Sequence, residues 1–198
     1  ANRLLGDHFL SPGKRLFDIV LAVLLLTILG LPMILLGMVV RLTSEGPALY
    51  WSNRIGVNNT IFRMPKFRTM KINTPIVATH LLVSPDQHLT RLGKVLRRYS
   101  LDELPQLFSV LKGDMSFVGP RPALYNQDDL IKLRTEKGVQ RLVPGITGWA
   151  QINGRDELPI PVKVNLEAFY IEHRSFAMDM KILFMTVFSV VGSEGVSH

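Results

Sequence analysis

The longest apolar stretch of the chain lies near the N-terminus and predicts a helix inserted into a membrane. Residues 19–40 carry no charged side chain, and the stretch is about long enough to cross a bilayer core of roughly 30 Å. It is apolar on every face, whereas a helix of a soluble domain usually keeps a polar face. It is also too long for the apolar core of a signal peptide, and no cleavage site of that type follows it.

Two topologies fit this stretch. Gly30 and Pro32 lie in its middle, and a proline inside a helix removes a backbone hydrogen bond and bends the helix. One topology is a kinked helix that spans the bilayer. The other is a re-entrant helix-break-helix that enters and leaves by the same face. Cations such as Lys14 and Arg41 flank both ends, so the positive-inside rule does not choose between the two.

The rest of the pattern predicts an α+β chain that is mostly helical. Residues 47–70 read as short strands around a turn at Asn58-Asn59, which is a small β element. Residues 71–88 read as a loop, and the glycine-rich stretch 143–155 reads as turns. Apolar periodicity predicts helices over residues 89–99, 104–111, 124–139, 162–174 and 178–191.

Two of these helices suit the surface of a membrane. The helix at 89–99 has Leu92, Leu96 and Tyr99 on one face and several cations elsewhere, a pattern found both on anionic membranes and in ordinary packing. The helix at 178–191 is strongly apolar but short for a span. We expect such interfacial helices to surround the active site.

Composition narrows the class of partner. The chain has 198 residues, a net charge of +7 and 47% hydrophobic residues. Such a basic, apolar chain favours anionic partners close to a membrane, namely phospholipid headgroups, phosphorylated lipids or nucleotides. Nucleic acid is the alternative for any basic chain. The absence of cysteine excludes disulfides, thiolate catalysis and Cys-based zinc sites, and the five histidines show no metal-ligand spacing.

The most informative charged motif lies within residues 96–122. Asp102 and Glu103 are adjacent, Arg97 precedes them, and the rigid tripeptide Pro120-Arg121-Pro122 follows. Carboxylates can attack phosphorus or hold a divalent metal, and arginines can clamp phosphate oxygens. This combination suits chemistry on a phosphorylated substrate.

A purely structural interpretation of the same acids is also available. Ser100 and Glu103 fit the S-x-x-E capping box of a helix start. Pro105 is better tolerated if Asp102 is the N-cap instead. With either N-cap the carboxylates lie at the positive end of a helix. The residues alone do not decide whether Ser100 or Asp102 begins that helix.

Several motifs occur together in the order seen in bacterial sugar transferases. They are KRLFD at 14–18, a proline-broken apolar stretch, PKFRTM at 65–70, LRRYSLDELPQLFSVLKGDMSFVGPRP at 96–122 and PGITGWAQINGR at 144–155. The chain resembles a small monotopic polyprenyl-phosphate phosphoglycosyl transferase, and the resemblance covers nearly the whole sequence. Val143 and Leu31 depart from it, because many relatives have Arg and Ser there.

The resemblance implies an Mg²⁺-dependent enzyme that moves a phosphosugar from a UDP-sugar to a polyprenyl phosphate, such as undecaprenyl phosphate, and releases UMP. Asp102 would be the nucleophile, forming a covalent aspartyl-phosphosugar, and would also be a metal ligand. Glu103 would be a general base or would position the metal. The expected phosphate-binding residues are Lys66, Arg68, Arg97, Arg121 and Arg155.

The resemblance also implies a location. Residues 1–41 would form a re-entrant membrane hairpin that breaks at Gly30 and Pro32, and residues 42–198 a catalytic domain on the cytoplasmic face of the bacterial inner membrane. The expected partners are UDP-sugar, polyprenyl phosphate and phospholipid, with no nucleic acid, and a homodimer is possible. The competing hypothesis is a non-catalytic basic module that binds lipid at the membrane surface.

Overall fold

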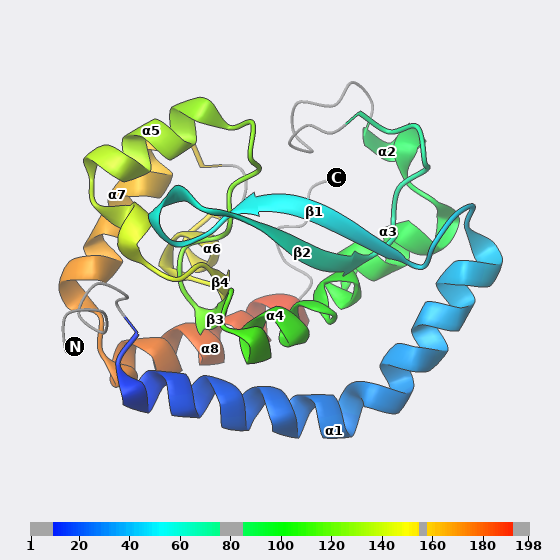
Figure 1. Cartoon of the computed structure of the whole chain (residues 1–198), viewed down its shortest axis with the longest axis horizontal. Helices are drawn as coiled ribbons and strands as arrows, with labels where there is room; N and C mark the ends of the chain where they lie inside the picture. The colour runs from blue at the N-terminus through cyan, green and yellow to red at the C-terminus, as the bar shows by residue number, and fades with distance from the viewer. Residues whose placement is uncertain (1–9, 76–84, 155–157, 192–198) are drawn as a thin grey trace.

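The computed structural model describes residues 10–75, 85–154 and 158–191. As predicted, the described chain is mostly helical with small β elements, and one long apolar helix lies at its N-terminal side (Figure 1). In chain order the elements are α1 (Pro12–Thr43), β1 (Leu49–Ile55), η1 (Val57–Asn59), β2 (Ile61–Phe67), α2 (Pro85–His88), α3 (Arg91–Arg98), η3 (Leu101–Glu103), α4 (Gln106–Lys112), β3 (Ser116–Val118), α5 (Asp128–Glu136), η4 (Val139–Arg141), β4 (Gly145–Thr147), α6 (Trp149–Ile152), α7 (Ile160–His173) and α8 (Phe176–Val191).

Helix α1 is continuous and bent. The Ser11 side chain accepts a hydrogen bond from the backbone N–H of Lys14 and caps its start. The helix then runs for 32 residues with Pro32 inside it, and its C-terminal part turns towards α3 (Figure 1). The chain therefore stays helical through Gly30 and Pro32, because one missing backbone bond bends a helix without ending it.

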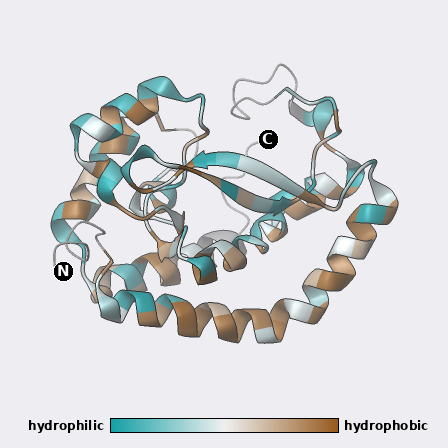
Figure 2. Ribbon diagram, in the orientation of Figure 1, coloured by the Kyte–Doolittle hydropathy of each residue, from teal (hydrophilic) through white to brown (hydrophobic). Residues whose placement is uncertain are grey.

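The apolar surface of α1 is mostly exposed. Among the described residues, α1 is the helix that is long and apolar enough to cross a membrane, with a mean hydropathy of 3.0 and 11% of the apolar window buried. Figure 2 shows this run of hydrophobic residues along the helix. A single stripe faces the rest of the protein, formed by the buried residues Asp18, Ala22, Met33 and Val40. The remaining faces suit contact with lipid tails.

A group of polar contacts holds the start of α1 to the domain. The Lys14 ammonium donates to Asp179 of α8 at 2.5 Å, and the Tyr170 hydroxyl of α7 donates to the other oxygen of Asp179 at 2.6 Å. The Arg15 guanidinium donates to the last carbonyls of α4, those of Val110 and Leu111. We call Lys14, Arg15, Tyr170 and Asp179 the anchor cluster.

Two small sheets position the loops of the domain. β1 and β2 form an antiparallel hairpin, whose turn places Asn58 and Asn59 at positive φ, as the predicted β element requires. β3 and β4 pair in parallel, which the turn prediction for residues 143–155 missed. The strands meet through backbone: a Cβ added to Gly145 would lie 2.1 Å from the Gly119 nitrogen. These two glycines permit close approach of two chain segments.

The other predicted helices form, with changed ends. α5 begins four residues late because the Gln127 side chain accepts from the Leu124 N–H and makes a turn there. The predicted loop at 71–88 ends early in the short helix α2, and its middle lies outside the described residues. Along the predicted apolar face of α3, Leu96 is buried and Leu92 packs against the core, whereas Tyr99, at the C-cap, is exposed.

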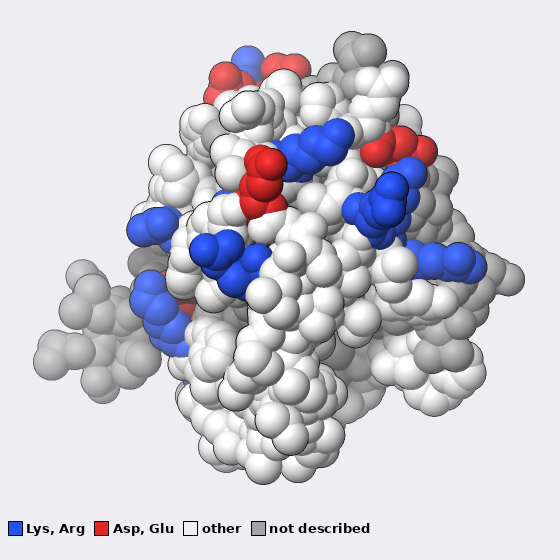
Figure 3. Space-filling view, turned by 90° about the vertical axis from the view of Figure 1, so that its right-hand side faces the viewer, with Lys and Arg blue, Asp and Glu red and all other residues white. Residues whose placement is uncertain are grey.

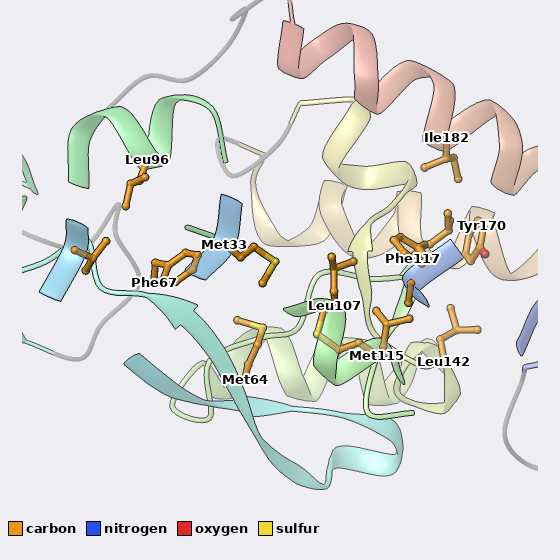
Figure 4. Packing of buried hydrophobic residues seen from close by; sticks show 14 residues of the cluster. Met33, Met64, Phe67, Leu96, Leu107, Met115, Phe117, Leu142, Tyr170 and Ile182 are labelled. Carbon is orange, nitrogen blue, oxygen red and sulfur yellow. The ribbon is translucent and has the colours of Figure 1, made fainter. Parts of the chain in front are cut away.

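One hydrophobic cluster joins these elements beneath the hairpin. It brings together Met33 of α1, Leu107 of α4, Phe117 of β3 and Ile182 of α8 (Figure 4). Burial of such side chains is the main favourable term in folding. Because α4 and β3 lie between the Asp102-Glu103 pair and the Pro120-Arg121-Pro122 tripeptide, this cluster also fixes the position of the charged motif.

Candidate active site

The predicted acids lie in a short turn between α3 and α4. Asp102 and Glu103 belong to η3, and Ser100 before them is left-handed, with φ of 55° and no capping bond from its side chain. Helix α4 begins only at Gln106, with Pro105 as N-cap. Ser100 therefore precedes only the short turn η3 and does not form the predicted capping box, and Asp102 is not the N-cap of α4. Proline suits the start of a helix because it has no N–H to satisfy, and α4 starts at this residue rather than at the acids.

Glu103 is held by two cations from distant parts of the chain. The Lys66 ammonium of β2 donates to Glu103 Oε1 at 2.6 Å, and the Arg121 guanidinium donates to the same oxygen at 3.0 Å. Burial alone would raise the pKa of Glu103, but Arg121 and Lys66 outweigh it and hold that pKa well below its usual range. Glu103 is therefore ionised at neutral pH.

Asp102 has a different environment. Only 6% of the residue is exposed, and its carboxylate makes no hydrogen bond or ion pair to the residues that the structure describes. Burial raises the pKa of Asp102 above its usual value, although Lys66 and Arg97 act to lower it. The two neighbouring carboxyls thus differ in basicity, as is common where paired acids take separate chemical roles. We call Lys66, Asp102, Glu103 and Arg121 the dyad cluster.

A small pocket opens at this cluster. Its lining is Arg54, Met64, Lys66, Glu103, Gln106, Arg121, Pro122 and Gly145. Three cations and one carboxylate thus share its wall, and Asp102 lies next to that carboxylate in sequence but outside the lining. A second, larger hollow is also lined by Pro120 and Pro122, but no carboxylate lines it. The smaller pocket, which Glu103 lines, is therefore the better candidate for chemistry on a phosphate.

The other predicted phosphate ligands lie at varied positions. Arg97 donates from Nε to Thr69 Oγ1 at 3.1 Å, and its charge acts on Asp102. Arg68 instead donates to the Pro47 carbonyl at 2.9 Å and is not among the contacts of the dyad cluster. Arg155 lies outside the described residues.

Four polar residues near the site were not predicted. They are Arg54, Gln106, Arg134 and Glu167. For Glu167 the sequence does hold a signal, because this acid falls between Val164 and Tyr170 on the buried face of α7. A charge on such a face requires a partner. The Arg134 guanidinium of α5 supplies it, at 2.5 and 2.8 Å.

Asp102 and Glu103 are the carboxyls of the dyad cluster that could hold Mg²⁺, although one oxygen of Glu103 already accepts from Lys66 and Arg121. This ion is usually held by one or two carboxylates together with substrate phosphates. Asp102 and Glu103 provide that number, and no cluster of three or more metal-ligating side chains occurs within residues 10–75, 85–154 and 158–191. The arrangement can therefore bind a phosphorylated ligand through cations and an ion, with one basic carboxyl beside it.

Comparison with known proteins agrees with this chemistry. The sequence profile described as bacterial sugar transferase matches residues 9–193. The chain is 43% identical over 188 residues to the uncharacterized sugar transferase EpsL of Bacillus subtilis, covering 93% of this chain and 90% of EpsL. It is 42% identical over 187 residues to the undecaprenyl-phosphate glucose phosphotransferase of Komagataeibacter xylinus, covering 88% of this chain and 35% of that protein.

A third relative is the UDP-glucose:undecaprenyl-phosphate glucose-1-phosphate transferase of Escherichia coli, 38% identical over 182 residues, with 88% of this chain and 39% of that protein covered. The chain thus spans less than half of these two longer enzymes but nearly all of EpsL. Because the profile match covers almost the whole sequence, the chain belongs to the bacterial sugar transferase family.

Proposed function

We propose that the protein transfers a sugar phosphate from a UDP-sugar to a polyprenyl phosphate, such as undecaprenyl phosphate, and releases UMP. The product would be a polyprenyl-diphosphate-sugar, the first membrane-bound intermediate in assembly of a bacterial polysaccharide or related glycan. The observation that carries the proposal is the dyad cluster, in which a basic, buried Asp102 lies beside a doubly ion-paired Glu103. Relatives named for glucose-1-phosphate transfer to undecaprenyl phosphate support it.

Asp102 acts as the nucleophile in two displacements. Its carboxylate oxygen attacks the sugar-linked phosphorus of the UDP-sugar, and the bond to the UMP oxygen breaks with its electron pair leaving on UMP. A polyprenyl phosphate oxygen then attacks the same phosphorus, and the Asp102 carboxylate leaves. A covalent intermediate lets two bulky substrates use one site in turn. The raised pKa of Asp102 favours this role, since a more basic carboxylate is the stronger nucleophile once ionised.

Glu103 serves mainly to position charge. A general base works best with a pKa near the operating pH, whereas Arg121 and Lys66 hold the pKa of Glu103 far below it. The carboxylate instead fixes these two cations at the pocket. There they can neutralise the phosphate oxygens as the transition state forms. When bound, Mg²⁺ would supply further neutralisation of the diphosphate.

Both ends of α1 contact the catalytic domain, which favours a re-entrant rather than a spanning helix. At one end Lys14 pairs with Asp179, and at the other Val40 is buried. A straight helix of this length would extend about 48 Å and would place its ends on opposite sides of a bilayer. Contact of both ends with one domain supports a topology in which both lie on the same side, and use of a UDP-sugar would make that side the cytoplasmic one.

Basic residues border the apolar surface of the molecule. α3 and the C-terminal end of α1 lie on the side drawn towards the viewer in Figure 3, where Lys and Arg side chains gather above a largely uncharged surface. Their exposed cations are Arg41, Arg91, Lys94 and Arg98. This arrangement suits a domain that rests on anionic headgroups while α1 enters the acyl layer.

Product release tests the reaction. Purified protein is incubated with Mg²⁺, polyprenyl phosphate and a panel of UDP-sugars, and UMP is measured. In a second arm, without polyprenyl phosphate, radiolabelled UDP-sugar should label the wild-type protein but not Asp102→Asn. The matched control is Asp114→Asn, which changes a carboxylate paired only with surface Lys112. Lack of UMP release across the panel would leave the basic lipid-binding module as the better hypothesis.

Cysteine labelling tests the topology, because the chain has no native cysteine. Gly13→Cys and Glu45→Cys place thiols at the exposed ends of α1, and Asp86→Cys marks the catalytic domain. In intact cells all three should be protected from an impermeant maleimide and should react after permeabilisation. Labelling of position 13 from outside, with 45 and 86 protected, would establish a spanning helix instead.

A further inference from the structure

The Pro120-Arg121-Pro122 segment is held through its carbonyl groups. Two of its three residues are prolines, which have no N–H, so carbonyl oxygens are its main backbone hydrogen-bonding groups. Each one accepts from a different element. Pro120 O accepts from the Gly145 N–H of β4 at 2.9 Å, Arg121 O from Arg134 Nη2 of α5 at 2.9 Å, and Pro122 O from Arg54 Nη1 of β1 at 3.1 Å.

The guanidinium of Arg134 is itself fixed by an ion pair. Its Nε and Nη2 donate to the two carboxylate oxygens of Glu167 on α7, and the side chains are 8% and 3% exposed. Such a bidentate pair defines the plane of the guanidinium. The same Nη2 therefore reaches the Arg121 carbonyl from a defined direction, and α5 and α7 are both coupled to the segment.

Arg54 approaches the segment from the hairpin. Its Nε donates to the buried Ser52 hydroxyl at 3.0 Å, which orients the guanidinium towards Pro122. Arg54 also lines the pocket with Lys66 and Arg121, and it lies close enough to Lys66 for the two charges to interact. The β1–β2 hairpin thus supplies Lys66 to the dyad cluster and Arg54 as a donor to the Pro122 carbonyl.

The position of Arg121 needs such support. Its side chain is 34% exposed, and the length of an arginine side chain gives it many rotamers. A phosphate contact is effective only when the guanidinium is already aimed at its target, because small misplacements cost rate. Rigid flanking prolines limit the backbone of Arg121, but they aim the side chain only if the segment is itself anchored.

We infer that Arg54 and Arg134, the latter oriented by Glu167, are positioning residues that clamp the Pro-Arg-Pro carbonyls and so aim Arg121 at Glu103 and at the phosphate of the donor. The inference rests on the proposed function, because it takes Arg121 as a phosphate ligand. It assigns to Arg54 and Arg134 a role that acts through the backbone of Arg121, and for Arg54, which also lines the pocket, the dependence on Arg121 separates this role from a direct contact with phosphate.

A double-mutant cycle tests this role. Arg54→Lys is the primary variant, because Arg54 is only half-buried and lysine keeps the charge while losing the two-pronged geometry. We expect kcat for UMP release to fall between about tenfold and 10²-fold, with little change in melting temperature. When Arg121 is already lysine, Arg54→Lys should lower kcat by less than about twofold, because the guanidinium that Arg54 positions is no longer present.

Two further variants complete the test. Because Arg134 is buried, the kcat of Arg134→Lys is expressed per folded molecule. This kcat should also fall, and the fall should again be smaller when Arg121 is already lysine. Arg63→Lys is the matched control, since Arg63 lies exposed on the same hairpin, over the Trp51 ring, and should leave kcat unchanged. UMP affinity, measured by calorimetry for each variant, gives a second readout that does not depend on turnover.

The outcomes separate the two levels of the proposal. An active wild-type enzyme whose Arg54→Lys effect is equal with and without Arg121 would overturn the positioning role. Unchanged activity in both lysine variants would overturn it as well. A wild-type protein that neither releases UMP nor binds it would reject the proposed function and, with it, the phosphate role of Arg121.

Discussion

The dyad cluster and the anchor cluster both combine a lysine and an arginine with a buried acid, but the acids have their hydrogen bonds satisfied in different ways. In the anchor cluster each oxygen of Asp179 has its own donor, Lys14 on one and Tyr170 on the other. In the dyad cluster two cations share one oxygen of Glu103, and the neighbouring Asp102 has no bonded partner among the described residues. One cluster is closed within the protein, whereas the other leaves a buried carboxyl beside a pocket.

This difference separates structural from chemical use of buried charge. A buried ion pair whose members satisfy each other mainly joins elements, here α1 to α7 and α8. A buried carboxyl without such a partner lowers stability, and proteins retain strained or unsatisfied groups mostly at functional sites. We therefore expect changes in the dyad cluster to alter rate more than stability, and changes in the anchor cluster to do the reverse.

The largest effect should come from Asp102→Asn. The amide cannot attack phosphorus, so the rate of UMP release should fall by roughly 10³-fold or more. The melting temperature should stay the same or rise, because an unpaired buried carboxyl has been replaced by a neutral group. Rate and melting are measured on the same detergent-solubilised sample. A large fall in melting temperature with normal turnover per folded molecule would make Asp102 structural and would remove the contrast between the clusters.

Arg121→Lys should have the next largest effect. Lysine keeps the charge near Glu103 but cannot make a planar two-pronged phosphate contact. We expect kcat/KM to fall by roughly 10²-fold with little change in melting. A purely structural role, in which Arg121 ties down the nearby acid Asp114, finds no support, since Asp114 pairs with Lys112. Equal loss of activity in Asp114→Asn would revive a structural explanation.

Asp179→Asn should affect stability instead of rate. It leaves Lys14, whose side chain is 17% exposed, without its carboxylate at the base of α1. Breaking a partly exposed pair of this kind costs about 2 kcal/mol, which lowers the melting temperature of a chain of this size by roughly 4–8 °C. Turnover per folded molecule should be normal. If turnover falls while melting is unchanged, the anchor cluster takes part in the chemistry.

Tyr170→Phe should give the smallest effect, because it removes only one hydrogen bond to Asp179. The expected cost is about 1 kcal/mol, or roughly 2–4 °C in melting temperature. Burial, together with Asp179, raises the pKa of Tyr170 above its usual value of 10.0. The contribution of the Tyr170 hydroxyl to the stability of the folded state is therefore complete below pH 10.0 and declines as pH rises further. The melting difference between wild type and variant should be constant from pH 7 to 9, which a pH series of thermal melts checks.

The sequence alone was enough to locate the membrane helix and the candidate site. The uncharged run at 19–40 identified α1, because membrane insertion depends on local composition and length. The motif around Asp102 and Glu103 identified the acids, and apolar periodicity located α3, α4, α7 and α8 to within a few residues. These features depend on neighbours within one or two turns, which a sequence displays directly.

The tertiary structure decided which groups meet. Lys66 and Arg121 reach Glu103 across 37 and 18 positions, and Lys14 reaches Asp179 across 165. No periodic pattern encodes such pairs, because they depend on how helices and strands pack. The same limit hid the clamp of Arg54 and Arg134, whose targets are backbone carbonyls that every residue possesses. It also explains the start of α4, where the sequence allowed two caps but the fold placed Asp102 and Glu103 outside the helix, with Lys66 and Arg121 bound to Glu103.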